Sequence, residues 1–133
     1  YGVMIAERFG AYHDGHACCL AALKLIERHG FDADLTSALL ALDQVSAWTS
    51  PMEFARRTAQ DAVDSARLSG DLAMSCYACN HLVSDSLFMG RYLPDVVEEL
   101  ETTVQNQLLQ QEVKLTLTES LLATKLSLMV QER

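Results

Sequence analysis

Prolines and glycines are scarce in this chain, with two prolines and six glycines among 133 residues. Both residue types weaken or break regular elements, so their scarcity leaves room for long helices. Half of the residues are apolar and 21% are charged, which is typical of a folded helical domain. The length predicts one domain.

Positive charge is also lacking, because ten Lys and Arg residues stand against eighteen Asp and Glu residues, for a net charge of -8. Binding to nucleic acid or to anionic lipid needs Lys and Arg side chains that replace released counterions. The composition therefore argues against a nucleic-acid partner and leaves proteins as the expected partners.

Long apolar runs are absent as well, since none reaches the roughly 20 residues that a membrane-spanning helix needs. The start has no basic region followed by an apolar core and a cleavage site, so no secretion signal is predicted. We expect a cytoplasmic chain without membrane insertion. It begins at Tyr1 and stops soon after the apolar stretch 126–130, without the polar outer faces of terminal repeats, so it is expected to be a piece of something longer.

Catalytic motifs are missing from the sequence. No glycine-rich loop ends in Gly-Lys-Ser/Thr, and the closest glycine pair, Gly10 and Gly15, has no lysine following it. Kinase signatures such as His-Arg-Asp and Asp-Phe-Gly do not occur, and no nucleophile is paired with a base in a defined local signature. We expect no enzyme activity and no cofactor in this segment.

Turn residues recur at a fixed interval. Gly10, Ser50 and Gly90 open turns about forty residues apart, and Gly30 and Gly70 open a second set midway between them. Helix-length apolar stretches separate these turns, which is typical of repeated helix pairs. The pattern predicts an all-α fold, a right-handed α-solenoid of antiparallel helix pairs of tetratricopeptide (TPR) type, with six to seven helices.

Capping residues set the expected helix boundaries. Gly30 is placed as a C-terminal cap, while the Asp34 carboxylate is expected to accept from first-turn amides. Ser50 is expected to cap the fourth helix, with Pro51 in its first helical position. The predicted helices cover 3–9, 13–29, 34–48, a segment after Pro51, 71 to about 89, and a segment from about 94.

Apolar spacing predicts which helix faces are buried. The third helix offers Leu35, Ala38, Leu39, Leu42 and Val45, and the fourth an alanine ridge of Ala55, Ala59, Ala62 and Ala66. The fifth offers Leu72, Cys76, Cys79, Val83 and Leu87. The sixth has Val96, Val97, Leu100, Val104 and Leu108 inward and Glu98, Glu99 and Glu101 outward, as a solvated face.

The C-terminal part gives a mixed pattern. Residues 113–118 alternate with the period of a strand before Leu122, Leu126 and Met129 resume helical spacing. A seventh helix is favoured, because an isolated strand would have no partner. We therefore expect TPR-like repeats over residues 1–110, and over 111–133 a C-terminal helix that starts a further repeat or serves as a connector.

Three segments, Ser69–Leu82, Leu87–Pro94 and Val97–Leu100, resemble the helical-repeat region of large hybrid signalling proteins of bacteria and fungi. In that family the region lies between a serine/threonine kinase-like domain with an AAA-type or STAND-type ATPase and downstream GAF and sensor histidine kinase modules. The resemblance covers roughly residues 1–110. It implies a segment that couples ATPase or kinase modules to a histidine kinase output.

The Gly-x-Tyr turns at Gly10 and Gly90 are similar to those that open the second helix of a tetratricopeptide pair. The period here exceeds the usual ~34 residues. The chain therefore resembles longer, degenerate repeats, and the standard peptide-groove residues are not transferred to it.

Cysteine and histidine form the sharpest metal-like pattern, with Cys76-x-x-Cys79 near His81, and His13-x-x-His16 before Cys18 and Cys19. Zinc needs four such groups that converge. Packing of small cysteines between helices is the favoured interpretation, and a zinc site the alternative. A disulfide is disfavoured in a cytosolic chain, and a redox Cys-x-x-Cys normally follows a strand.

His81 admits two interpretations. The family resemblance suggests a phosphoacceptor, but Asn80, Leu82 and Val83 lack the charged neighbour of a His-box. A half-buried histidine that hydrogen-bonds locally is favoured.

Surface recognition is the function that remains. In a solenoid of this type the first helix of each pair lines the concave side, here 34–48 and 72–89. The candidate protein-binding residues are the polar and aromatic members of these helices: Asp43, Gln44, Trp48, Tyr77, Asn80, His81, Ser84 and Asp85. We expect a non-catalytic interaction scaffold or spacer within a multidomain signal-transduction protein of the two-component type. The alternative is a free-standing adaptor that binds a peptide or partner protein.

Overall fold

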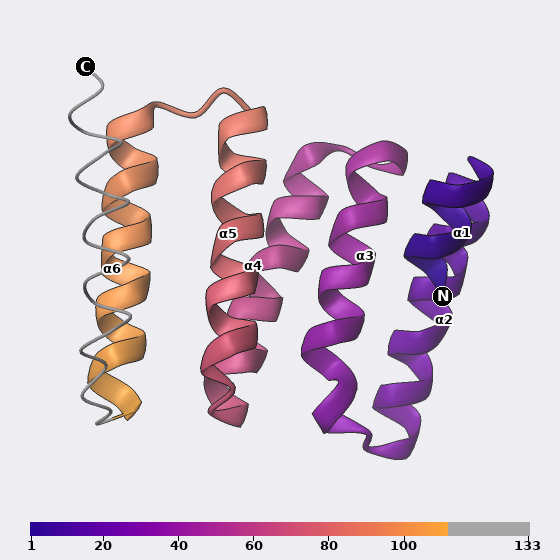
Figure 1. The fold of residues 1–133 in the computed structure, drawn as a ribbon, viewed down its shortest axis with the longest axis horizontal. Coiled ribbons are helices and arrows are strands. Elements are labelled where there is room, and N and C mark those ends of the chain that lie inside the picture. The colour runs from indigo at the N-terminus through magenta and orange to yellow at the C-terminus, as the bar shows by residue number, and fades with distance from the viewer. Residues whose placement is uncertain (112–133) are drawn as a thin grey trace. The chain divides into compact units, whose positions relative to one another are not determined.

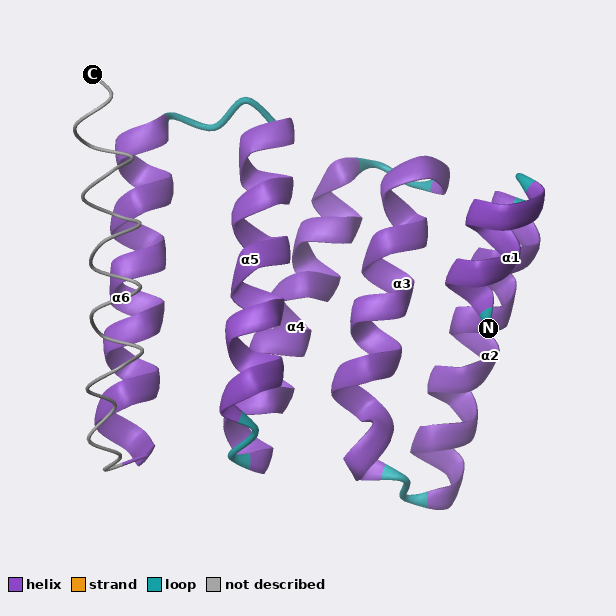
Figure 2. Ribbon diagram, in the orientation of Figure 1, coloured by secondary structure: helices purple, strands orange, loops and turns teal. Residues whose placement is uncertain are grey.

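The computed structural model describes the backbone of residues 1–111 and the side chains of residues 1–105. The described part is all-α, with six α-helices and a single 3₁₀ turn, η1 (Asp32–Asp34) (Figure 2). The helices are α1 (Gly2–Phe9), α2 (Tyr12–His29), α3 (Leu35–Thr49), α4 (Met52–Ser69), α5 (Leu72–Phe88) and α6 (Leu93–Gln111). The predicted seventh helix lies outside the described residues.

The chain divides into two compact units, residues 1–91 and residues 92–133. In the first unit each helix packs mainly on the helix that follows it in sequence, from α1 through α5 (Figure 1). Two further contacts skip one helix, because α1 also touches α3 and α3 also touches α5. α3 therefore has neighbours on several sides, and its buried residues join the core of this unit.

Glycine ends three of the helices, as the sequence predicts. Gly10, Gly30 and Gly70 follow α1, α2 and α4 in the left-handed region, with φ between 67° and 72°. Side chains with a Cβ atom rarely adopt this conformation, so glycine terminates these helices at little cost. Ser50 ends α3 instead in an extended conformation, with φ at -138°.

Two of the predicted side-chain caps are wrong. Asp34 precedes α3 but makes no capping bond with its side chain, because its backbone is already helical, with φ at -95° and ψ at -5°, whereas a capping residue normally has extended backbone. Ser50 precedes Pro51, which restricts it to extended backbone, and α4 begins only at Met52. Asp71 does cap α5, since its carboxylate accepts from the Met74 amide at 3.0 Å.

α1 and α2 approach closely at two glycines. A Cβ atom on Gly15 would lie 2.6 Å from the Gly2 carbonyl oxygen and 3.1 Å from the Ala6 Cβ atom. A Cβ atom on Gly2 would collide with the Cys19 Sγ atom and the Gly15 carbonyl. The absence of side chains at both positions is therefore what lets these two backbones pack together.

The alanine ridge of α4 is confirmed, because Ala55, Ala59, Ala62 and Ala66 are all fully buried. In α3, Leu42 and Val45 are buried as predicted, while Leu35, Ala38 and Leu39 are half-buried.

The predicted buried stripe of α5 is confirmed only in part, because Leu72, Cys76 and Val83 are half-buried. Only Cys79 of that stripe is buried, and Leu87 is exposed. The residues that α5 buries are instead Ser75, Ala78, Cys79, Leu82, Asp85 and Ser86. α5 is apolar or uncharged around most of its circumference, so hydrophobic spacing does not select a face. Several of these buried side chains are small, which allows α5 to pack closely against its neighbour α4.

α6 begins at Leu93, close to the predicted start, and Val96 is buried. Glu98 and Glu101 are exposed, whereas Glu99, which was predicted to point outward, is half-buried. Leu108 lies beyond the described side chains. Across the helices that the structure describes, none is long and apolar enough to cross a bilayer.

Candidate functional site

A set of five polar residues bridges α3 and α5 in the first unit, and we refer to it as the α3–α5 polar cluster. Asp43 and Gln44 come from α3, and Tyr77, His81 and Asp85 come from α5. The four-residue spacing from Tyr77 to His81 to Asp85 places these three side chains on one face of α5. All five belong to the set that the sequence predicts as contact residues.

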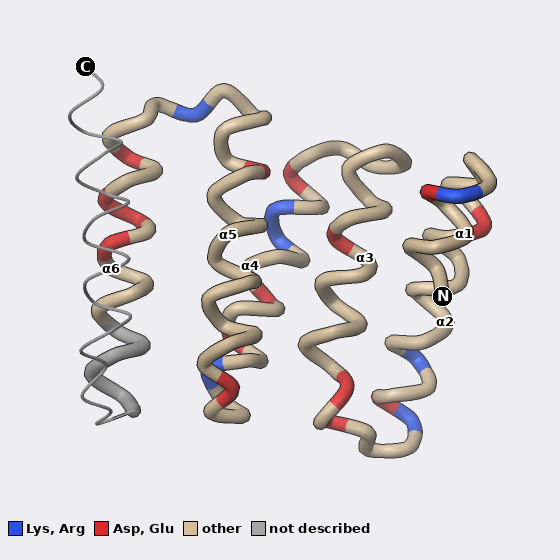
Figure 3. The backbone as a smooth tube through the Cα atoms, viewed as in Figure 1, with Lys and Arg blue, Asp and Glu red and all other residues tan. Residues whose placement is uncertain are grey.

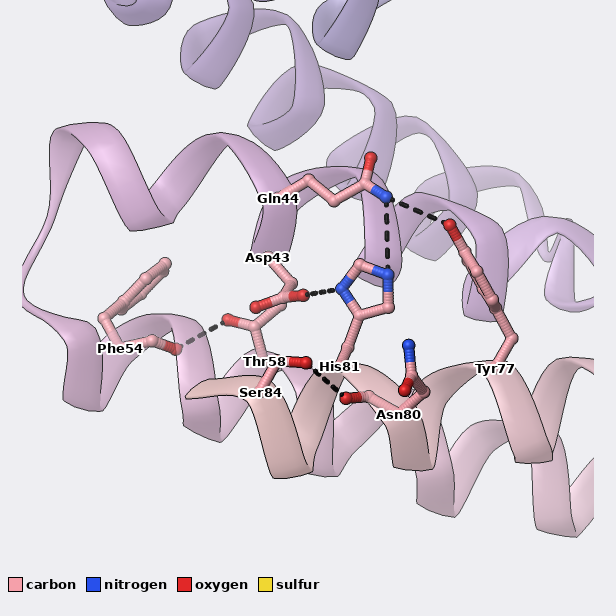
Figure 4. Close-up of polar contacts among 8 residues, drawn as sticks. All are labelled: Asp43, Gln44, Phe54, Thr58, Tyr77, Asn80, His81 and Ser84. Atoms are coloured by element: carbon pink, nitrogen blue, oxygen red, sulfur yellow. Dashed lines mark hydrogen bonds and ion pairs between the residues drawn. The ribbon is translucent and has the colours of Figure 1, made fainter. Parts of the chain in front are cut away.

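Asp43 is the buried centre of the cluster, with 1% of its surface exposed. Its Oδ2 atom lies 2.7 Å from Nδ1 of His81, whose side chain is 18% exposed (Figure 4). This bond spans 38 residues of sequence. His81 is thus half-buried, as the favoured interpretation predicts, but its partner lies on another helix and not in the local sequence.

Gln44 and Tyr77 complete the exposed side of the cluster. The Gln44 amide nitrogen donates to the Tyr77 hydroxyl at 3.3 Å and lies 3.4 Å from Nε2 of His81 (Figure 4). When the imidazole hydrogen is on Nδ1, His81 donates to Asp43 at that atom, and a neutral ring can accept from Gln44 at Nε2. The edge-on Tyr77 ring, 4.8 Å from the His81 ring between centroids, holds the imidazole from the other side.

Asp85 lies behind His81 and is also buried. Burial, a hydrogen bond to Asp43 and the negative charge of Asp43, in that order of size, raise the pKa of its carboxyl group to about 7. The charges of His81 and Arg56 oppose this rise and lower the pKa by a smaller amount. Asp85 is therefore partly protonated near neutral pH.

α4 contributes a positive charge to the cluster through Arg56. Its Nε atom donates to the Ser86 hydroxyl at 3.1 Å. Ser86 directly follows Asp85, so the positive charge of Arg56 acts on the Asp85 carboxyl group. Sequence reasoning missed Arg56, because it stands beside the alanine ridge without any motif of its own. Its position thirty residues before Ser86 reflects the packing of α4 on α5, which hydrophobic spacing on either helix does not reveal.

Three predicted contact residues lie outside the cluster. Trp48 is 73% exposed and packs against Tyr12 of α2, with ring centroids 5.7 Å apart. Asn80 is exposed, and its backbone carbonyl accepts from the Ser84 hydroxyl at 2.8 Å (Figure 4).

Within the cluster, Asp43 and Asp85 are buried, so a partner would reach them only through His81.

The cluster orients an imidazole against a carboxylate, as the His-Asp pair of a hydrolase catalytic triad does. Nε2 of His81 faces the Gln44 amide in place of a Ser or Cys nucleophile. The geometry therefore fixes the position of the His81 imidazole.

The histidine and cysteine patterns of the sequence separate in space. His16 bonds Thr49 through Nδ1 at 2.6 Å and stacks on Phe54. Cys79 is buried and Cys76 half-buried, neither is part of a disulfide, and burial raises the pKa of Cys76. A raised thiol pKa lowers the fraction of reactive thiolate. Among residues 1–105, no three His, Cys, Asp or Glu side chains are grouped so that they could hold a metal ion.

Comparison with known proteins identifies no relative of this chain. Protein-family models, curated proteins and solved structures were each searched with the chain, and none matched.

Proposed function

We propose that this chain is a non-catalytic helical-repeat segment of a multidomain signal-transduction protein, in which it serves as an interaction scaffold or spacer. The observation that carries the proposal is the uncharged, aromatic surface of α3 and α5. Its expected partners are kinase, ATPase or histidine kinase modules of the same polypeptide.

The charge distribution supports a protein-binding role for α3 and α5. Asp43 and Asp85 are the sole charged residues in these two helices, and both are buried. Figure 3 shows the contrast with α4, which carries charged residues of both signs. A surface free of charge loses little solvation on binding, and exposed Trp and Tyr side chains supply anchors with few degrees of freedom.

We propose a right-handed, TPR-like solenoid with a period of about forty residues, and the helix contacts support the stacking of helix pairs in it. α1, α3 and α5 touch in alternation, as the first helices of stacked pairs would. The glycine-ended helices recur at the same interval as the turn residues of the sequence. The family resemblance of Ser69–Leu82 supplies the remaining part of the proposal, the coupling of ATPase or kinase modules to a histidine kinase.

The gene that encodes this chain tests the proposal directly. We expect the reading frame to continue on both sides, with a kinase-like and ATPase region upstream and a histidine kinase downstream. A reading frame that encodes a protein of about this length would contradict the proposal and favour the free-standing adaptor.

Binding to the flanking modules tests the surface itself. Each module is titrated into the chain by calorimetry, with Trp48→Ala and Tyr77→Ala as variants. We expect each variant to weaken binding by roughly tenfold, the effect of losing about 1.4 kcal/mol from an aromatic anchor. Leu68→Ala is the matched control, because Leu68 is an exposed apolar residue of α4. Equal affinity of all four proteins would show that the partner binds elsewhere.

A further inference from the structure

We propose that Asp43 and Asp85 share a single proton in a hydrogen bond between α3 and α5, which forms a latch that weakens as the pH rises. The latch joins the two helices that carry the proposed recognition surface. It does not depend on the proposed function, because it is tested through folding alone.

Two unpartnered oxygen atoms carry the geometric argument. Oδ2 of Asp43 is bonded to His81, but Oδ1 of Asp43 and Oδ2 of Asp85 are buried, and no donor group reaches them in the part of the chain that the structure describes. Two buried carboxylates side by side repel each other strongly. One proton placed between the two carboxyl groups removes the repulsion and gives both unpartnered oxygens a role.

The surrounding charges come from three helices. Three charged groups act on Asp85: Asp43 of α3, His81 of α5 itself and Arg56 of α4. With one proton on the carboxyl pair, a single negative charge remains close to the positive charge of Arg56. A proton placed on the imidazole of His81 in place of the pair would leave the two buried oxygens without a donor. The carboxyl pair is therefore the better place for the proton.

The direction of the pH effect follows from the pKa of Asp85, which burial and the neighbouring Asp43 raise from 3.8 to about 7. The folded state therefore binds this proton more tightly than the unfolded state. The stabilisation is fully present below the unfolded pKa and is lost as the pH rises through the folded pKa, about 7. Loss of the proton sets two anions against each other between α3 and α5.

The same proton is linked to the exposed side of the cluster. Asp43 orients the imidazole of His81, and the imidazole in turn contacts Gln44 and Tyr77. Separation of the carboxyl groups at high pH therefore disturbs side chains on the surface as well as in the core. The pair acts as a regulatory element beneath the α3–α5 surface.

Urea unfolding between about pH 5.5 and about pH 8.5 tests the latch, with Asp85→Asn as the main variant. The asparagine is neutral at every pH and donates an N–H group to Asp43, so it imitates the protonated acid. We expect the urea midpoint of the wild-type chain to fall as the pH rises, and the midpoint of Asp85→Asn to change much less. Asp61→Asn is the matched control, because Asp61 is an exposed carboxylate of α4. It should keep the wild-type pH dependence.

The proposal is overturned if Asp85→Asn keeps the wild-type slope, or if the wild-type midpoint does not fall over this pH range. Carboxyl carbon NMR of the wild-type chain gives a second test that needs no variant. We expect one aspartate carboxyl group to titrate well above the ordinary value of about 4. Titration of every aspartate below about pH 5 would likewise overturn the shared proton.

Discussion

α4 and α5 pack against each other but differ in the kinds of side chain that they bury and expose. α4 buries alanines and exposes six charged residues, Glu53, Arg56, Arg57, Asp61, Asp64 and Arg67, to varying degrees. α5 buries two serines and its single aspartate, and leaves Tyr77, Leu87 and Phe88 exposed. The comparison shows that polarity determines the orientation of α4, whereas side-chain size and specific polar partners determine that of α5.

Overpacking the ridge is expected to break this arrangement most strongly. Ala62→Leu inserts a larger side chain where the wild-type residue has no exposed surface, so we expect a loss of about 1–3 kcal/mol in unfolding free energy. Urea unfolding measures the effect. Ala73→Leu serves as control, because Ala73 is an exposed alanine of α5. Equal stability of both variants would mean that α4 does not present its alanines to α5.

The starts of the helices offer a smaller and sharper test. Asp71 caps α5 with its side chain, whereas Asp34 precedes α3 without such a bond. We expect Asp71→Ala to lower the unfolding free energy by about 1 kcal/mol, and Asp34→Ala to lower it by clearly less. Thermal unfolding of the two variants side by side makes the comparison. A larger loss for Asp34→Ala would contradict the assignment of the caps.

The buried serines of α5 lead to a prediction of opposite sign. Ser75 is buried, and in the described part of the chain no partner is found for its hydroxyl group. We expect Ser75→Ala to raise the unfolding free energy by about 0.5–1 kcal/mol, because a buried hydroxyl without a partner costs free energy. Ser84→Ala, at a more exposed hydroxyl bonded to a carbonyl, should be close to neutral. Destabilisation by Ser75→Ala would reveal a partner for that hydroxyl.

The smallest effect is expected at the charged surface of α4. Arg67 pairs with Asp64 at 2.7 Å, and both side chains are substantially exposed. Exposed pairs of this kind contribute little, so Arg67→Gln should lower the unfolding free energy by no more than about 0.5 kcal/mol. Chemical denaturation at low and high salt measures it. A loss above ~1 kcal/mol would show that the Arg67 side chain does more than pair with Asp64.

The six helices of residues 1–111 and most of their turns were predictable from the sequence, because glycines at regular intervals mark helix ends directly. The alanine ridge was predictable too, since Ala55, Ala59, Ala62 and Ala66 share one face at three-and-four spacing. The buried face of α5 was not, because nearly every position of that helix is uncharged. Choosing its face requires knowledge of the neighbour against which it packs.

The candidate site was predictable as a set of residues but not as an arrangement. Reasoning from exposed polar positions named Asp43, His81 and Asp85, but placed the carboxylates on the surface. Burial of an aspartate is costly unless a hydrogen-bond donor or an opposite charge lies beside its carboxyl group. That partner stands 38 residues away for Asp43 and His81, so no local pattern could have revealed it.

The polar side-chain contacts between helices in the first unit have a consequence for how the chain folds. They join residues 29 to 38 positions apart, from Thr36 with Ser65 to Asp43 with His81. Chains whose contacts are local in sequence pay little loop-closure entropy and fold quickly. We therefore expect each helix to pack on the preceding helix soon after it leaves the ribosome, before the rest of the polypeptide is synthesised.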